Sequence, residues 1–432
     1  MITELRLWDF KNFKDATLRL GPFTVVVGTN ASGKSNIRDA FRFLHGIGRG
    51  YTLADIIGGR YGAGGQPEWA QMRGAASEII RFGKTSFLIG VKILVSKDYP
   101  RQASSPTADY GIGVEKTDHG RGGFRVSYEQ LTVGSETIYT SHPGQDDPMD
   151  AQDDEAHLHI RMAKTGSQRK FGTKVTALAD QPALSQVGEF RHVVRQHKAR
   201  AQEVLDIFAG IRFLDLVPDL MRKPAFPGQL VLGDSGENLP TVLQEICQDA
   251  ARKDVLLQWI QELTPIDVVD FSFPRDPVTG LVQLALKQHD DHTISAYSAS
   301  DGTLRFLAML AALLGKNPAK LYFFEEIDNG IHPSRLKLLL DLIEGQTAKS
   351  GVQVVTTTHS PDLLSMIGDR TFQNTSVVFR PPQSDHSIIR PVTDLPGVSR
   401  LREEQGLGRL HASGWLEDVL AFEADAEAAP AE

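Results

Sequence analysis

One short segment of the chain has the residue types and the spacing that hold a triphosphate. Gly28 and Gly33 bracket four residues, and Lys34 and Ser35 follow directly. Small residues let the backbone wrap closely around an anion, so that its N–H groups and the dipole of a following helix face the phosphates. Lys34 would reach the β- and γ-phosphates, and the Ser35 hydroxyl would bind Mg²⁺. The predicted nucleoside triphosphate site comprises Gly28, Thr29, Asn30, Ala31, Ser32, Gly33, Lys34 and Ser35.

Two adjacent carboxylates, Glu325 and Glu326, follow the apolar run 321–324. Mg²⁺ prefers oxygen ligands and keeps several waters, so Glu325 would hold it directly or through water. Glu326 would orient or deprotonate the water that attacks the γ-phosphate. His359 ends a second run rich in β-branched residues, 352–358, where its imidazole could hydrogen-bond to that phosphate. These three side chains are the predicted catalytic and metal-binding groups.

A further candidate anion site is Ser300-Asp301-Gly302, at the start of an apolar-periodic helix. The first N–H groups of a helix have no partner within it, so they can bind an anion. Serine and aspartate are also preferred as helix caps, and this alternative interpretation stays open.

The elements that would position these residues follow from periodicity. Residues 23–27 have the pattern of a buried strand, and Ile37, Ala40, Phe41 and Leu44 recur at helical spacing after it. Residues 1–20 alternate like a hairpin, and an antiparallel meander is predicted from about residue 77. Helices are predicted over 186–220 and 239–263.

By these patterns the chain divides into four parts. Residues 1–180 are expected to form an N-terminal lobe with the phosphate loop and an antiparallel β subdomain. Residues 181–265 are expected to be a helical insertion, and 266–416 a C-terminal lobe with the remaining motifs. The acidic, alanine-rich stretch 417–432 has the composition of a disordered tail.

Several polar clusters have simpler interpretations than a site. The Asp-rich interval 143–155 is predicted to be a surface loop, because loops favour aspartate for turn geometry. The segment 289–292, His-Asp-Asp-His, joins two alternating runs and is predicted to be a hairpin turn rather than a metal site. Basic residues from Arg191 to Arg200 indicate either a solvated helix face or, less strongly, a DNA contact.

Composition excludes several classes of protein. The formal net charge of −8 argues against a generally basic protein that coats nucleic acid. The single cysteine, Cys247, excludes an internal disulfide framework and suits a reducing compartment. The sequence contains neither a signal peptide pattern nor an apolar run of about 18 residues, so we expect a cytoplasmic protein without membrane contact.

Taken together, the segments GTNASGKS, SDGT, LYFFEEIDNGIHP and TTTHSP, with DSGENL at 234–239, resemble the ABC-type ATPase heads of the SMC, RecF and OLD-nuclease group. The resemblance is strongest to the compact AAA-type proteins of prokaryotic defence and repair. It implies an α/β P-loop fold with a mixed central sheet, an antiparallel β lobe and a helical insertion. ATP and Mg²⁺ are the implied cofactors, and ATP hydrolysis is the implied activity.

In the resembled family, the signature serine of one subunit contacts the nucleotide held by the P-loop of another. The resemblance therefore implies an ATP-sandwich homodimer in which Ser300 and Gly302 act in trans. It assigns Asp328 to the loop that couples the two sites and His359 to the switch. A glutamine-bearing loop is also implied, with Gln66 and Gln71 as open alternatives.

The sequence departs from the family at defined positions. Glu325 stands where the metal-binding acid is usually aspartate, and Ile327 stands where proline is common. The residues after His359 carry no pattern of a Toprim nuclease, and no long heptad repeat indicates coiled-coil arms. We therefore expect the ATP-driven switch of a repair or anti-phage system with a separately encoded effector, and DNA as a candidate partner. The alternatives are a slow or inactive nucleotide-gated scaffold and, less favoured by the motifs, a transporter ATPase.

Overall fold

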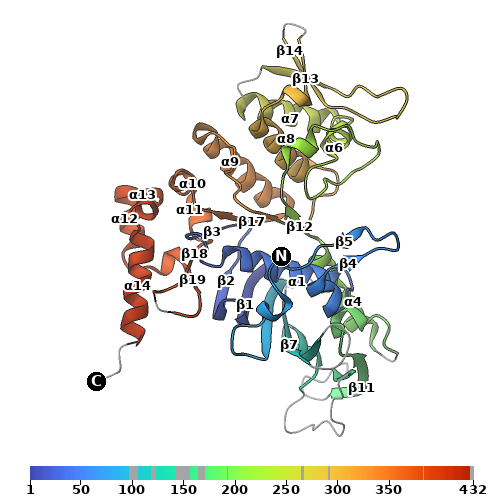
Figure 1. Cartoon of the computed structure of the whole chain (residues 1–432), viewed down its shortest axis with the longest axis vertical. Helices are drawn as coiled ribbons and strands as arrows, with labels where there is room; N and C mark the ends of the chain where they lie inside the picture. The colour runs from blue at the N-terminus through green and yellow to red at the C-terminus, as the bar shows by residue number, and fades with distance from the viewer. Residues whose placement is uncertain are drawn as a thin grey trace.

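The computed structural model describes residues 1–96, 106–117, 123–142, 156–163, 171–191, 193–263, 267–289, 292–382 and 384–428. Figure 1 shows a central sheet with helices on its faces, a long-stranded sheet on one side and a cap of helices at the C-terminal end. The Asp-rich interval 143–155 and the turn residues 290–291 lie outside the described residues. Among the described residues, no helix has the length and apolar character that crossing a bilayer requires.

The central sheet has six strands, and five of them run parallel. Almost all residues of these five strands are buried, as expected for parallel strands that are covered on both faces. Because the strands are parallel, their carboxyl ends meet at one edge, where the predicted motifs follow. In spatial order the strands are β12 (Ile211–Leu214), β16 (Leu321–Phe324), β17 (Gln353–Thr358), β3 (Phe23–Val27), β18 (Thr375–Phe379) and the antiparallel β19 (Ile388–Pro391).

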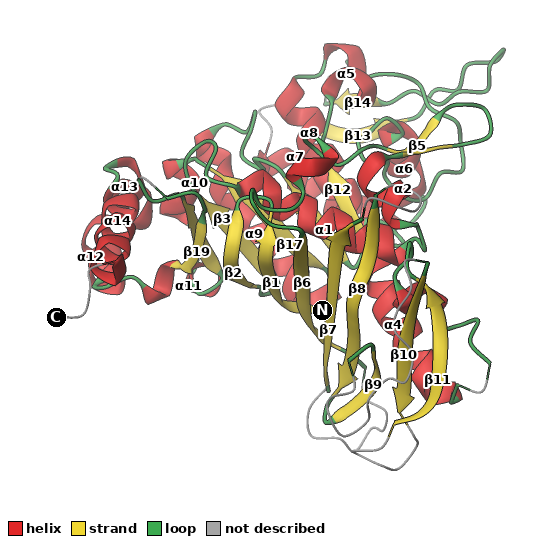
Figure 2. Cartoon of the chain, turned by 60° about the horizontal axis from the view of Figure 1, so that its bottom comes forward, coloured by secondary structure: helices red, strands yellow, loops and turns green. Residues whose placement is uncertain are grey.

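The second sheet has eight antiparallel strands, which Figure 2 shows as long, twisted ribbons. Its first two strands form the predicted N-terminal hairpin, with Leu5 paired to Leu18. The rest form the predicted meander, in which buried residues largely alternate with partly buried ones. In spatial order the strands are β11 (Phe171–Leu178), β10 (His157–Ala163), β9 (Glu136–Thr140), β8 (Phe124–Val133), β7 (Thr107–Lys116), β6 (Ser86–Leu94), β1 (Ile2–Phe10) and β2 (Phe13–Arg19).

Helix α1 (Lys34–Gly48) lies between the two sheets and packs on both of them, which holds the phosphate loop at its N-terminus in place. Phe41 packs on Phe323 of the central sheet, with ring centroids 5.7 Å apart. Phe43 packs edge-on against Phe87 of the antiparallel sheet at 5.6 Å. The other face of the central sheet is covered by a second apolar core that includes residues of α8 (Asp301–Leu314) and α9 (Pro333–Ser350).

The remaining elements are short sheets and helices around these cores. A three-stranded sheet contains β13 (Val268–Ser272), β14 (Ala285–Gln288) and β15 (Thr293–Ser295), so the predicted hairpin around 289–292 joins its last two strands. A two-stranded sheet pairs β4 (Arg60–Tyr61) with β5 (Pro67–Trp69). The other helices are α2 (Leu53–Gly58), α3 (Ala183–Gln186), α4 (Arg195–Ala209), α5 (Pro218–Met221), α6 (Leu239–Ile246), α7 (Ala250–Leu263), α10 (Pro361–Met366), α11 (Asp369–Phe372), α12 (Val398–Gln405), α13 (Leu407–Ala412), α14 (Trp415–Ala428) and the 3₁₀ turns η1 (Ala76–Glu78), η2 (Ala296–Ser298) and η3 (Val392–Asp394).

Two expectations about the outer parts of the chain need correction. The stretch 181–265 is not purely a helical insertion, because β12 within it is a strand of the central sheet and pairs in parallel with β16. The prediction of a disordered tail from residue 417 is wrong up to residue 428, which lies in α14. Leu416 and Leu420 of this helix are buried in the second core, and their burial holds the acidic segment in place.

Candidate nucleotide-binding site

The phosphate loop occupies the turn between β3 and α1, as the sequence predicts. Gly28 leaves no room for a side chain, since a Cβ there would lie 2.3 Å from the carbonyl oxygen of Val378 on the neighbouring strand. Gly33 has a φ of 116°, and its Cβ would lie 2.5 Å from the Nδ2 atom of Asn12. Both glycines are therefore required by the close approach of strand β18 and of the first hairpin.

Lys34 begins α1, and its side chain reaches back over the loop. Its Nζ atom donates to the carbonyl oxygens of Gly28, at 2.5 Å, and Thr29, at 2.8 Å. Burial lowers the pKa of this ammonium group, while the negative charges of Glu326 and Glu417 act in the opposite direction. The ammonium group is thus held above the position where the loop would wrap a phosphate.

The two predicted carboxylates follow β16 and differ in their surroundings. Glu325 accepts a hydrogen bond from Nη2 of Arg73 at 2.6 Å, and its Oε2 atom lies 3.8 Å from Nε of Arg38. Glu326 has a φ of 49°, in the left-handed region of backbone conformation. Residues other than glycine rarely adopt this region, and those that do are over-represented at functional sites. The Glu326 carboxylate lies 3.2 Å from Nδ1 of His359. Glu325 therefore faces two arginines, whereas Glu326 faces His359.

The end of β17 links these acids to the loop that follows them. The Thr357 hydroxyl accepts a hydrogen bond from the backbone N–H of Glu326 at 3.3 Å. The Thr358 hydroxyl donates to the carboxylate of Asp328 at 2.8 Å. Glu326 and Asp328 are therefore both hydrogen-bonded to the end of β17, the strand that His359 follows.

A cavity of about 460 Å³ opens where these elements meet, a size in the usual range for a small-molecule site. It brings together the phosphate loop, both acids and the end of β17. His359 borders it through Glu326. The lining residues are Asn30, Ala31, Gly33, Lys34, Ser35, Asn36, Arg73, Asp215, Glu325, Glu326, Asn329 and Thr357.

Sequence reasoning missed two charged residues of this cavity, Arg73 and Asp215. Asp215 follows β12, the strand beside β16, so its place at the carboxyl edge would have been predictable had that short strand been recognised. Arg73 lies in a loop without periodicity and carries no such signal. Neither Gln66 nor Gln71 lines the cavity, although Gln71 is held nearby through a hydrogen bond to the carbonyl oxygen of Gly74 at 3.4 Å.

The donor atoms at this cavity fit a magnesium ion. The Ser35 hydroxyl and the carboxylates of Glu325 and Asp215 supply the hard oxygen ligands that Mg²⁺ prefers. Among the described residues, no group of three histidine, cysteine, aspartate or glutamate side chains is placed to hold a metal ion by itself. This arrangement agrees with Mg²⁺ sites in which phosphates and waters complete the coordination.

The predicted signature residues do not line this cavity. Ser300 caps α8, and its Oγ atom accepts a hydrogen bond from the Thr303 N–H at 3.2 Å. Gly302 packs so tightly that a Cβ there would lie 2.5 Å from the carbonyl oxygen of Gly330. Arg305 donates to the Asn329 carbonyl oxygen at 2.9 Å. The start of α8 therefore rests against the loop after the two acids, outside the cavity.

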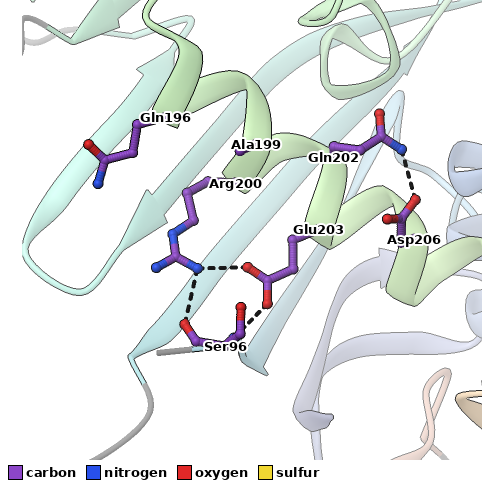
Figure 3. A pocket seen from close by; sticks show the side chains of 7 residues that line it. All are labelled: Ser96, Gln196, Ala199, Arg200, Gln202, Glu203 and Asp206. Atoms are coloured by element: carbon purple, nitrogen blue, oxygen red, sulfur yellow. Dashed lines mark hydrogen bonds and ion pairs between the residues drawn. The ribbon is translucent and has the colours of Figure 1, made fainter. Parts of the chain in front are cut away.

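The basic stretch from Arg191 to Arg200 does not form one charged face. Figure 3 shows Arg200 directed toward Glu203 and Ser96 in a pocket beside α4. Its Nη1 atom donates to Glu203 at 2.7 Å and to the Ser96 carbonyl oxygen at 3.1 Å, and the residue is 6% exposed. Arg191 and Arg195 are exposed. A nucleic acid would thus meet fewer charges here than the sequence alone indicates.

The chain is similar in sequence to a known family and to a known protein. Residues 23–365 match the model of a family described as "AAA domain, putative AbiEii toxin, Type IV TA system". A protein of Helicobacter pylori (strain ATCC 700392 / 26695) named "ATP/GTP phosphatase" is 32% identical over 406 residues, which cover 90% of this chain and 94% of the relative.

Solved structures of SMC head domains also align with the chain. The SMC head bound to the C-terminal winged-helix domain of ScpA aligns with a TM-score of 0.47 at 15% identity, over 90% of this chain and 97% of that one. The SMC head domain from Thermotoga maritima aligns with a TM-score of 0.41 at 12% identity, over 90% and 98%.

Proposed function

This chain belongs to the AbiEii-type family of AAA domains, and from that premise we propose that it binds and hydrolyses ATP with Mg²⁺ in nucleotide-sandwich dimers. The observation that supports this most is the cavity, which joins Lys34 and Ser35 to Glu325 and Glu326. The name of the Helicobacter pylori relative makes GTP a second candidate substrate. Hydrolysis would be the step that resets the protein.

In this proposal each side chain has a separate task. Lys34 and the loop N–H groups bind the β- and γ-phosphates, while Ser35 and Glu325 hold the metal. Bound Mg²⁺ would neutralise charge on the phosphates. Glu326 orients the attacking water, and His359, 3.2 Å from its carboxylate, contacts the γ-phosphate and senses its loss.

The proposed dimer is supported by the position of the predicted signature residues relative to the cavity. Ser300 and Gly302 do not line the cavity, and Gly302 packs against the carbonyl oxygen of Gly330 instead. A second copy would supply them across the nucleotide, so that Ser300 and Gly302 act in trans. ATP binding would close the dimer, and hydrolysis would open it.

We further propose that the dimer is the switch or sensor subunit of a DNA repair or anti-phage defence system with a separately encoded effector. The family description, which names a toxin of a toxin–antitoxin system, supports a defence role. The exposed Arg191 and Arg195 offer a limited surface for DNA. In this proposal the nucleotide state of the ATPase determines whether the effector is held or released.

Steady-state turnover of the purified chain tests the proposal. We would measure ATP and GTP hydrolysis with and without double-stranded DNA at low salt, because phosphate-backbone contacts weaken steeply as salt rises. Glu326→Gln and Lys34→Ala serve as backgrounds without hydrolysis and without binding. Turnover above both variants supports an enzyme, and stimulation by DNA supports the DNA-linked sensor. Turnover equal to that of Glu326→Gln contradicts hydrolysis.

The second candidate function is a nucleotide-gated scaffold that sequesters a partner without turnover. The observation that favours it is the pairing of Glu325 with Arg73, which occupies the metal-binding acid. In cells, Glu326→Gln would then keep activity while Lys34→Ala loses it. Loss of activity in both variants would instead favour the hydrolytic switch.

A further inference from the structure

The turn of the N-terminal hairpin places one amide side chain, that of Asn12, against the phosphate loop. Its Nδ2 atom donates to the Ser32 carbonyl oxygen at 3.3 Å and to Oγ of Ser387 at 2.7 Å. Its Oδ1 atom accepts a hydrogen bond from Nδ2 of Asn36 at 2.6 Å. Because a carbonyl oxygen only accepts hydrogen bonds, the Nδ2 end of the amide must face Ser32. One side chain therefore connects the phosphate loop, the first turn of α1 and the segment before β19.

The backbone that carries Asn12 is held in place around the turn. Phe10 and Phe13 pair across the hairpin, and both are fully buried. The N–H of Ser387, another fully buried residue, donates to the Asn12 carbonyl oxygen at 2.8 Å. A short side chain on such a backbone has few alternative positions, because its rotamers are few. Its hydrogen bonds therefore hold the phosphate loop in a fixed place relative to the hairpin.

The contact with Ser32 determines which way the next peptide group of the loop faces. A trans peptide is planar, and its C=O and N–H groups point in opposite directions. Since the Ser32 carbonyl oxygen faces Asn12, the N–H of Gly33 in the same peptide faces away from Asn12. Gly33 lines the nucleotide cavity, and Asn12 does not. Asn12 thus directs one backbone donor of the loop toward the site of the phosphates.

The contact with Asn36 acts on a second donor. The side-chain amide of asparagine has two N–H bonds, and in Asn36 one of them is used by Asn12. Asn36 lines the cavity with Lys34 and Ser35, so its other N–H is left to hydrogen-bond a phosphate oxygen. Without Asn12, the Asn36 side chain would lose the partner that fixes its orientation. Donors that are already directed bind a ligand more tightly than donors that must first be ordered.

We propose that Asn12 is a positioning residue of the proposed ATPase, which holds the Gly33 N–H and the Asn36 amide toward the triphosphate, and that Ser387 orients Asn12. The inference rests on the proposed function. It deepens that function because the phosphate loop then depends on two segments outside its motif, which lie 375 positions apart in the sequence. The triphosphate site is complete only when the hairpin at one end of the chain meets the segment before β19 at the other.

Equilibrium binding tests the proposal in the Glu326→Gln background, in which bound ATP is not consumed. We would titrate fluorescently labelled ATP and ADP into the parent and into Asn12→Leu, which keeps the size of the side chain but removes its hydrogen bonds. Both dissociation constants should rise about tenfold, because two directed donors of the loop are lost. In the hydrolysing protein the same change should raise KM about tenfold and lower kcat at most about threefold, since Glu325 and Glu326 are held by other residues.

Ser387→Ala is a second variant, which removes a single oxygen atom and leaves the Asn12 amide in place. It should raise the ATP dissociation constant about fivefold, because Asn12 loses one of the partners that orient it. In Asn12→Leu the same change should have no further effect, since it acts through the Asn12 amide, and additive effects would contradict this role. If Asn12→Leu does not fold, Ser387→Ala alone decides, and an ATP affinity within about twofold of the parent overturns the proposal.

Asn374→Leu is the matched control, because Asn374 lies in a similar relation to the other end of β3. Like Asn12, it is partly buried, and its side chain packs where a glycine, here Gly21, leaves room for it. Its Nδ2 atom donates to the Arg370 carbonyl oxygen at 2.8 Å. The control should lower the melting temperature without changing ATP affinity.

Two results would overturn the proposal. One is an ATP dissociation constant of Asn12→Leu within about twofold of the parent, and the other is an equal rise in Asn374→Leu, which would indicate a general loosening of the fold. Failure of the parent itself to bind ATP would instead contradict the proposed function.

Discussion

Glu129 is a buried acid that has no direct part in the proposed chemistry but should make the stability of the protein depend on pH. It is fully buried in β8, where it accepts hydrogen bonds from the hydroxyls of Tyr110 and Tyr139, each at 3.0 Å. The N–H groups of Ala183 and Leu184 also donate to it, at 2.6 and 2.8 Å. Burial raises its pKa to about 7, although these hydrogen bonds act in the opposite direction.

This raised pKa predicts that the free energy of unfolding falls between about pH 4.5 and about pH 7. The native state keeps a proton that the unfolded chain releases near its ordinary pKa of 4.5, so the contribution of Glu129 is complete below that pH. It is lost as the pH rises through about 7. Glu129→Gln cannot ionise, so its melting temperature should fall less than that of the parent from pH 5 to pH 8.

The measurement is a thermal melt of both proteins at each pH, with Glu115→Gln as the control. Glu115 pairs with Arg125 at 2.8 Å on the neighbouring strand and is 38% exposed, so its substitution should leave the slope unchanged. Equal slopes for the parent and Glu129→Gln would rule out Glu129 as the source of the dependence.

Residues with a motif were predictable from the sequence, and residues without one were not. The glycines and Lys34 of the phosphate loop are constrained by local geometry, and their spacing alone places them between a strand and a helix. Arg73 lies in the cavity in contact with Glu325, from which it is separated by 252 positions in the sequence. Neither hydrophobic periodicity nor a sequence motif predicts such a long-range contact.

At the scale of elements, the start of α8 is held by a clamp. Nη2 of Arg222 donates to the Ala299 carbonyl oxygen at 3.1 Å and to Asp301 at 2.6 Å, and its side chain is 17% exposed. Arg222 follows α5, so this contact joins two elements around the signature segment. It fixes the backbone that would present Ser300 and Gly302 to a second copy.

We therefore expect Arg222→Gln to weaken dimer closure and leave nucleotide binding intact. Turnover of Arg222→Gln should fall about tenfold, and so should its ATP-dependent dimerisation when the change is made in the non-hydrolysing Glu326→Gln background. The reason is that a hydrogen bond to a charged group contributes about 1.5–3 kcal/mol. ATP affinity of the monomer should match the parent. Turnover at low and high protein concentration, with analytical ultracentrifugation, gives these values.

Arg402→Gln is the control for this prediction. Arg402 makes the same kinds of contact, to Asp369 at 2.8 Å and to the Ile367 carbonyl oxygen at 3.2 Å, and is 23% exposed. It lies among the C-terminal helices, away from α8. An Arg222→Gln protein that loses ATP binding, or that dimerises like the parent, would contradict the clamp.

The prediction of helices and strands failed for one very short strand and for one segment whose acidic composition is typical of disorder. The strand β12 has four residues and lies one residue after α4, so a helical period extends across it. The acidic composition of 417–432 indicated disorder, yet successive turns of α14 carry Leu416 and Leu420 into the core. Long elements such as β3 with α1, or the hairpin of β1 and β2, were predictable because their patterns run over whole strands and turns.

At the scale of the molecule, the proposed dimer makes a prediction about mixtures of inactive chains. Each nucleotide would lie between the P-loop of one copy and the signature segment of the other. Lys34→Ala disables the first surface and Ser300→Arg the second, so each variant alone should be inactive. In a mixed dimer one of the two sites contains neither change, and an equimolar mixture should recover about a quarter of parental turnover.

Turnover of the mixture, corrected for each variant alone, is the measurement. As a control, Lys34→Ala mixed with Glu326→Gln should recover nothing, because both changes affect the P-loop side of the sandwich and every site then carries one of them. Absence of recovery with Ser300→Arg, in proteins that still form dimers, would contradict a site shared between copies.

The strand order of the central sheet also sets when this protein becomes able to bind a nucleotide. The phosphate-loop strand β3 pairs with β17 (Gln353–Thr358) and β18 (Thr375–Phe379), which leave the ribosome long after it. At about 5–20 residues per second, the interval lasts roughly tens of seconds. Throughout that time the N-terminal hairpin can form, but β3 has neither neighbour. A nascent chain therefore cannot respond to ATP, and messages truncated before β17 would yield products that are inert toward nucleotide and exposed to proteases.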